Sequence, residues 1–168
     1  SAVWAVLFSL VVIFMYILIR FRRMSYSIGA VAAVFHDVLI VLALFSILYG
    51  RLPFSLEIDQ AFIAAILTVI GYSLNDTVVV FDRVREYFGI KSGSRDDIVN
   101  AALNSTLSRT INTSLTTFFV LLIIFLFGGE VIRGFMFALM IGVVVGTYSS
   151  LFIATPIMVD TLKKEDDK

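Results

Sequence analysis

The chain has 168 residues, of which 60% are hydrophobic, and its mean hydropathy is +0.99. Soluble domains are about half apolar, so this composition places the chain in a lipid bilayer. The lack of cysteine excludes disulfides and thiolate metal sites, and a single histidine, His36, cannot form a multi-histidine metal site. Basic and acidic residues balance to zero formal charge, which argues against a nucleic-acid surface. We expect neither a metal nor a cofactor.

Five apolar segments are each long enough to cross about 30 Å of hydrocarbon as a helix. We therefore predict an all-α, polytopic membrane bundle of five transmembrane helices, forming one domain over residues 1–168. The predicted helices cover about residues 2–20, 25–50, 58–81, 109–129 and 133–160. The first is not a cleavable signal peptide, because it lacks a basic leader and is followed by arginines. The chain does not begin with methionine, so we expect it to be a piece of a longer protein.

Basic residues are divided unequally between the two sides of this predicted bundle. Eleven of the 13 Lys and Arg residues lie in the first connection, the third connection with its flanks, or the C-terminal tail. Only Arg51 and Arg133 lie in the second and fourth connections. Because basic loops stay on the cytoplasmic side, we predict that the N-terminus of this chain is outside and its C-terminus is cytoplasmic.

The main interruption of the apolar pattern is the region 82–108. Ser94 is followed three residues later by Asp97, a capping-box spacing that predicts a helix start. We predict a cytoplasmic linker helix over about residues 95–108. No proline or glycine follows until the end of the fourth apolar segment, so this helix either continues into the membrane or bends within 104–108.

The fifth predicted helix carries small residues at every fourth position. Residues four apart share a helix face, so they form a groove that a neighbouring backbone can approach closely, either as static packing or as a sliding surface. Pro156 predicts a kink or an early end of this helix. The small residues are Gly134, Ala138, Gly142, Gly146, Ser150 and Ala154.

The fourth predicted helix carries a polar stripe, formed by Arg109, Asn112, Thr113 and Thr116. Their spacing places them on one face. Polar faces of membrane helices meet protein or water. Alternatively, the threonine hydroxyls bond to their own helix and the arginine reaches toward the membrane surface.

Asp76 stands within an otherwise apolar run, six residues before Asp82. An intramembrane carboxylate costs about 2.5 to 3.5 kcal/mol on insertion scales, and loss of solvent disfavours the charged form of a carboxyl group. These properties suit a group that gains and loses a proton. The alternative is an aspartate that only locks two helices together, with Arg109 as its partner. The functional hypothesis adds that protonation of Asp76 breaks this pair and frees Arg109 to move.

Asp37 lies in the middle of the second predicted helix and is either a second relay site or a buried hydrogen-bonding group. Successive helical residues point about 100° apart, so we expect His36 to point elsewhere and to form no dyad with Asp37. The sequence contains no nucleophile elbow, Walker A loop or HExxH motif, and we expect no enzyme activity.

Three stretches carry a resemblance to a known family: GYSLNDTVVVFDRVRE, LNSTLSRTINTSLTT and GTYSSLFIA. They are similar to motifs of the SecF branch of the SecD/SecF protein-export family, within the resistance-nodulation-division superfamily. The resemblance covers essentially the whole chain, as the last five of six transmembrane helices. The family's first helix and periplasmic domain precede this region, so we expect an excised segment or the C-terminal part of a SecD-SecF fusion.

The resemblance implies a half-bundle of resistance-nodulation-division type in the bacterial cytoplasmic (inner) membrane. It implies partnership with SecD, the SecYEG translocon and an exported preprotein, and driving by protons rather than by covalent chemistry. Asp76 matches the family's essential aspartate, Arg109 its arginine in the next helix, and Thr113 a polar residue of its proton path. Alternatives are half of a related proton-coupled efflux or lipid exporter, or a non-conducting assembly scaffold.

Overall fold

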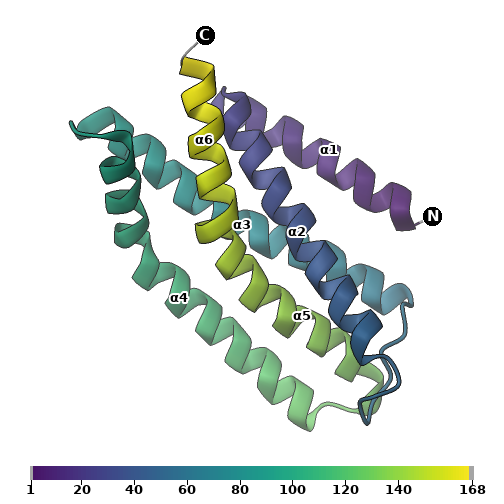
Figure 1. Cartoon of the computed structure of the whole chain (residues 1–168). Helices are drawn as coiled ribbons and strands as arrows, with labels where there is room; N and C mark the ends of the chain where they lie inside the picture. Colours follow the sequence, from purple (N-terminus) through teal and green to yellow (C-terminus); the bar gives the residue numbers. More distant parts are fainter. Residues whose placement is uncertain (1, 167–168) are drawn as a thin grey trace.

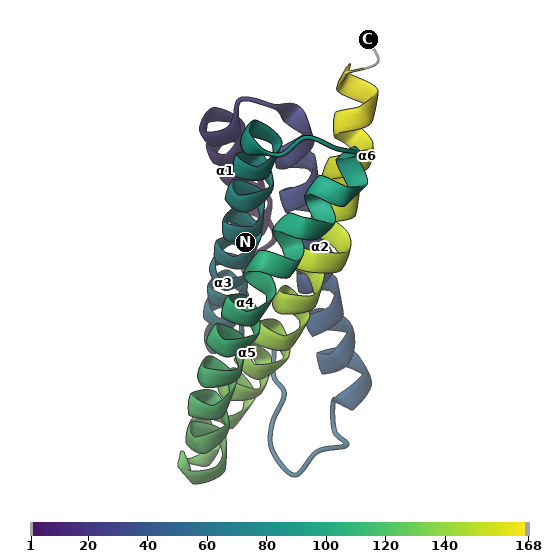
Figure 2. The same cartoon turned by 90° about the vertical axis from the view of Figure 1, so that its left-hand side faces the viewer.

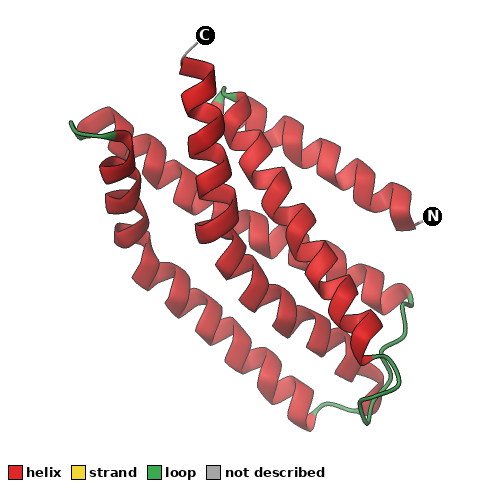
Figure 3. Ribbon diagram, in the orientation of Figure 1, coloured by secondary structure: helices red, strands yellow, loops and turns green. Residues whose placement is uncertain are grey.

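A computed structural model describes residues 2–166, which form helices joined by short connections (Figures 1 and 3). The elements, in chain order, are α1 (Ala2–Phe21), α2 (Met24–Leu48), α3 (Gln60–Ile90), α4 (Arg95–Phe127), α5 (Glu130–Ser149), a π-helical turn (Ser150–Ala154) and α6 (Thr155–Asp166).

Four stretches of the described chain are long and apolar enough to cross a membrane: α2, α3, α4 and the continuous run from α5 through α6. The 20-residue α1 is also apolar. The outer faces of α1 and α4 expose large hydrophobic side chains, among them Phe8 and Phe119, which is a surface suited to lipid. The fold is therefore an all-α bundle of a multi-pass membrane protein.

The run from α5 to α6 passes through the middle of the bundle. α5 packs against α2, α3 and α4, while α6 packs mainly against α2. α1 contacts α2, and α1 and α4 lie at opposite edges of the bundle (Figures 1 and 2). The connections between α1 and α2 and between α3 and α4 lie at the same end of the bundle as the C-terminus, and the other two connections lie at the opposite end (Figure 1).

Aromatic side chains fill both ends of the bundle. Near the connection between α1 and α2, Phe21 stacks on Tyr26 with ring centroids 4.8 Å apart, and Phe81 meets Tyr26 edge-on at 5.2 Å. Toward the opposite end, Phe45 packs on Phe62 with centroids 4.5 Å apart. The polar groups between these two clusters are therefore enclosed within the bundle.

α3 continues well past its predicted end at residue 81, so that boundary is wrong. Its last turns carry charges that support a helix: Arg83 pairs with Glu86 at 2.7 Å, three residues further on. Arg20 of α1 also pairs with Asp82 at 3.1 Å. The fall in hydrophobicity marks a change of environment along the helix, and the helix itself continues.

α4 is one continuous helix, so the predicted linker helix over 95–108 is not a separate element. Its start is as predicted, because Ser94 is the N-cap and accepts a hydrogen bond from the amide of Asp97 at 3.2 Å. The axis of α4 changes direction after its first turns (Figure 1). The hydroxyls of Ser105 and Thr106 donate to carbonyl oxygens of the preceding turn, a bonding pattern that bends helices.

The last helical run does not end near residue 160 but continues to Asp166. The π-helical turn comes two residues before Pro156. Proline has no amide hydrogen, and in an α-helix its ring clashes with the carbonyl four residues earlier; a wider π turn accommodates both defects. Within this turn the Thr155 hydroxyl donates to the Ser150 carbonyl at 2.9 Å.

The small residues of α5 lie where this helix packs against α3. A side chain at Gly142 would collide with Val69, and a Cβ atom at Gly146 would lie 3.0 Å from Cβ of Ser73. The close approach is thus made by α3 side chains. The other residues of the stripe within or next to α5 are Gly134, which faces the Ser55 carbonyl, and the fully buried Ala138 and Ser150.

Candidate functional site

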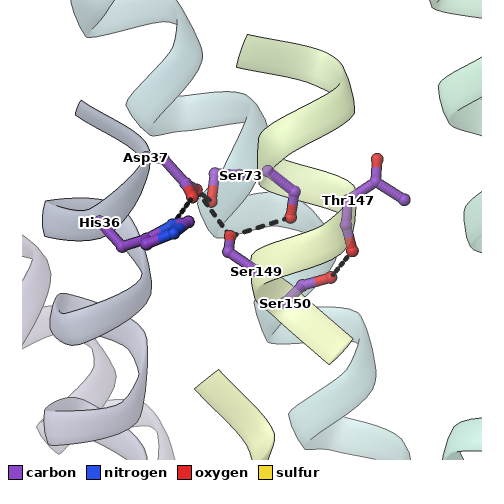
Figure 4. A network of polar contacts seen from close by, with 7 residues as sticks. His36, Asp37, Ser73, Thr147, Ser149 and Ser150 are labelled. Atoms are coloured by element: carbon purple, nitrogen blue, oxygen red, sulfur yellow. Dashed lines mark hydrogen bonds and ion pairs between the residues drawn. The ribbon is translucent and has the colours of Figure 1, made fainter. Parts of the chain in front are cut away.

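Asp37 lies at the junction of α2, α3 and α5 and is 0% exposed. Its Oδ2 atom accepts hydrogen bonds from Ser73 Oγ at 2.5 Å and from Ser149 Oγ at 2.7 Å. Figure 4 shows both serines pointing toward the carboxyl group from α3 and α5. One carboxyl oxygen therefore links three helices, because each serine comes from a different neighbour of α2.

The prediction that His36 points away from Asp37 is wrong. Its Nδ1 atom lies 3.0 Å from Asp37 Oδ1, and Figure 4 shows the ring beside the carboxyl group. Neighbouring Cα–Cβ bonds do diverge on a helix, but the imidazole is long enough to turn back over the adjacent side chain. His36 is only half-buried, so its ring connects the enclosed carboxyl group with the outside of α2.

Asp76 lies one turn along α3 from Ser73 and is 4% exposed. Its Oδ2 atom is buried and has no hydrogen-bond partner among residues 2–166. The hydroxyl groups of Ser114 on α4 and Thr147 on α5 lie beside its carboxyl group, and these two hydroxyls contact each other at 2.5 Å. A buried polar atom without a partner is costly, most of all in a charged group. The buried Oδ2 atom of Asp76 therefore lacks a hydrogen-bond partner that the described residues could supply.

Arg109 is exposed on α4, and none of the ion pairs within 4.0 Å among the described residues joins it to Asp76. Thr113 is also exposed, and its hydroxyl donates to the Arg109 carbonyl at 2.9 Å. Thr116 bonds back to its own helix in the same way. The described residues thus leave the polar stripe of α4 uncovered, which makes it available to a partner.

Sequence reasoning missed four hydroxyl residues that surround the two acids. A signal for them was present, because Ser73 lies three residues before Asp76 and Ser149 three residues after Gly146. Hydroxyl side chains inside apolar helices on the faces of acidic or small residues are candidates for such contacts. The four residues are Ser73, Ser114, Thr147 and Ser149.

The chain is thus a multi-pass membrane protein whose apolar helices bury two carboxyl groups among hydroxyl side chains. Ionisable groups in such positions are candidates for ion and proton pathways. No group of three or more His or acidic residues within the described chain is arranged to hold a metal ion. Residues 1–164 match the family model described as "Protein export membrane protein SecD/SecF, C-terminal". The chain belongs to this family.

Curated relatives are SecF proteins. The chain is 61% identical over 161 residues to the protein translocase subunit SecF of Rhodothermus marinus, an alignment that covers 95% of this chain and 52% of that protein. It is 46% identical over 162 residues to the protein translocase subunit SecF of Petrotoga mobilis, covering 96% of this chain and 51% of that protein. The chain therefore spans about half the length of these relatives.

Two solved structures share the fold. One is SecDF in its super-membrane-facing form, with a TM-score of 0.87 and 38% identity, covering 98% of this chain and 22% of that one. The other is SecDF of Thermus thermophilus, described as a translocon-associated membrane protein, with a TM-score of 0.84 and 40% identity, covering 96% and 22%. The helical bundle is thus that of a SecF-type C-terminal region.

Proposed function

We propose that the chain forms part of a proton-motive-force-driven accessory subunit of the Sec protein translocase, which assists preprotein export with SecD and SecYEG. The single observation that supports a proton-coupled role best is the buried Oδ2 atom of Asp76, which has no hydrogen-bond partner among the described residues. The similarity to SecF proteins supports the assignment to export. The site lies in the inner membrane, with the basic end of the bundle in the cytoplasm.

In this proposal Asp76 is the group that holds the transported proton. The neutral carboxyl group suits the enclosed position between α3, α4 and α5. Loss of the proton creates a charge that the Ser114 and Thr147 hydroxyls can stabilise and that attracts the Arg109 guanidinium. Each proton cycle therefore changes the forces between α3 and α4, and these changes drive movement of the attached parts of the protein.

The exposed stripe of α4 faces SecD in this proposal. Arg109 and Thr113 lie on the outer surface of α4, and a guanidinium facing hydrocarbon is unfavourable. A helix of SecD with acidic or polar residues would cover this surface and complete the proton path from its other side. The similarity of the chain to solved structures of SecDF supports this pairing.

In this proposal Asp37 is a second group that binds and releases a proton. Its Oδ2 atom is occupied by Ser73 and Ser149, and its Oδ1 atom faces His36 at 3.0 Å. An imidazole beside a carboxyl group can pass a proton to and from it. Ser73, which donates to Asp37, stands one helical turn from Asp76 on α3, so this helix connects the surroundings of the two acids.

The test is completion of preprotein translocation in inverted membrane vesicles, with and without a proton gradient. Asp76→Asn keeps the size of the side chain but cannot release a proton, so we expect it to abolish stimulation by the gradient. The exposed Asp96 offers a matched control, since Asp96→Asn makes the same chemical change outside the site. Full stimulation in Asp76→Asn would reject the proton relay.

A further inference from the structure

A cavity of about 390 Å³ lies at the basic end of the bundle, among the ends of α2, α3, α4 and α6. It lies away from Asp37 and Asp76, which are enclosed deeper between the helices. Its lining combines three guanidinium groups with aromatic and aliphatic side chains. These residues are Arg23, Arg85, Arg95, Tyr26, Phe88 and Leu162.

Positive charge exceeds negative charge in the described lining of this cavity. Asp166 is the one carboxylate there, and it is shared between Arg23 and Arg95, with nitrogen–oxygen distances of 2.8 Å to each. Arg85 makes only a long contact of 3.4 Å to the carbonyl of Arg20, and it joins no ion pair among residues 2–166.

A buried donor in the same lining has no acceptor. The Nη1 atom of Arg95 is enclosed and makes no hydrogen bond with any described residue. A buried guanidinium nitrogen without an acceptor is costly, and an anionic oxygen is its strongest partner. Arg85 and Arg95 line the same cavity and offer it guanidinium N–H groups, whose forked geometry matches the oxygens of a phosphate.

We propose that this cavity binds the phosphate group of an anionic phospholipid. A free phosphate ion shares the same chemistry, but the cavity also has apolar walls formed by Tyr26, Phe88 and Leu162. It lies at the basic end of apolar helices, and basic residues are typical of helix ends on the cytoplasmic side of a membrane. Basic pockets between membrane helices at this depth bind anionic headgroups. The lipid thereby holds together the ends of four helices.

The lipid proposal can be tested by titrating the full-length protein with phosphatidylglycerol and counting bound lipid by native mass spectrometry. We expect Arg85→Gln and Arg95→Gln each to weaken the apparent Kd by about fivefold, since each arginine near an anionic headgroup contributes about that factor. The control variants are Arg51→Gln, in the connection between α2 and α3, and Arg133→Gln, in the first turn of α5, which remove the same charge at the opposite end of the bundle. They should leave the affinity unchanged.

A second variant tests the cavity without changing its charge. Gly89 belongs to the lining, and a Cβ atom there would meet no other atom within 4 Å. Gly89→Leu should therefore fold normally, with an unchanged thermal midpoint, while it blocks the lipid. Lipid affinity equal to wild type in Gly89→Leu, or in both arginine variants, would overturn the proposal.

Competition separates the two sources of phosphate. Inorganic phosphate at the concentration of the lipid should not displace phosphatidylglycerol, because it cannot use the apolar walls. Displacement at equal concentration would show a site for a soluble anion and would also overturn the proposal. Phosphatidylcholine, which has no net charge, should bind the wild type more weakly than phosphatidylglycerol does. The arginine variants should bind phosphatidylcholine with the same low affinity as the wild type.

Discussion

The Ser149 hydroxyl donates to Asp37 Oδ2 across 2.7 Å, and this bond joins α5 to α2 at the residue before the π-helical turn. Ser73 of α3 donates to the same oxygen. Asp76, one turn from Ser73, has no comparable bond at its buried Oδ2 atom within the described chain. The two buried acids therefore differ, because Asp37 is held by three side chains while Asp76 is free to change its partners.

Replacement of Asp37 should destabilise the bundle. Asp37→Ala leaves the hydroxyls of Ser73 and Ser149 without their acceptor, and we expect a loss of about 2 to 4 kcal/mol in the free energy of unfolding. Asp37→Asn keeps an acceptor oxygen and should lose less. The measurement is reversible unfolding in mixed micelles, with Thr68→Ala as a control, because the Thr68 hydroxyl is exposed and bonds only to its own helix. Equal stability of Asp37→Ala and wild type would show that the network contributes little.

The close packing of α5 against α3 predicts that larger side chains on α5 destabilise the protein, and Gly71 of α3 provides a control position. Gly142→Leu places a side chain where Val69 already packs, whereas a Cβ atom at Gly71 meets nothing within 4 Å. Overpacking costs about 1 to 3 kcal/mol, so the thermal midpoint in detergent should fall for Gly142→Leu and stay unchanged for Gly71→Leu. Gly146→Leu should behave like Gly142→Leu, because Ser73 faces it. A wild-type midpoint for both α5 variants would mean that α3 can move away from this face.

The fold class followed from the sequence because hydrophobicity reports directly on the membrane environment. Helix boundaries did not follow, since charged side chains such as Arg83 and Glu86 pair along α3 and continue the helix beyond the apolar segment. The widened turn before Pro156 was also missed, because proline predicts a defect without specifying how the neighbouring turn relieves it.

The sequence was informative about which residues are unusual and less informative about their partners. Asp76 and Asp37 stood out as acids in apolar helices, and both are buried. Arg109 stood out as a partner for Asp76, yet it lies on the exposed face of α4. His36 was misplaced because spacing gives the direction of a Cα–Cβ bond, whereas contact depends on the rotamer and length of the side chain.

The orientation of the bundle makes a prediction about labelling. Ser92 in the connection between α3 and α4 and Ser55 in the connection between α2 and α3 are both exposed. These two connections lie at opposite ends of the bundle (Figure 1). If basic loops are cytoplasmic, a cysteine at Ser55 should react with a membrane-impermeant maleimide in intact cells, and a cysteine at Ser92 only after the membrane is opened. No native cysteine interferes in this chain. The reverse pattern would invert the proposed topology and the direction of proton movement.

The central claim is that Asp76 changes its protonation state, and infrared difference spectroscopy of the full-length protein in lipid tests it most directly. Protonated carboxyl groups have their own C=O stretching band, which carboxylates lack, so a pH step should change that band. We predict that one component of this pH-dependent band is lost in Asp76→Asn and is retained in the exposed control Asp96→Asn. An unchanged spectrum in folded Asp76→Asn would contradict the account and leave Asp76 as a structural link between helices.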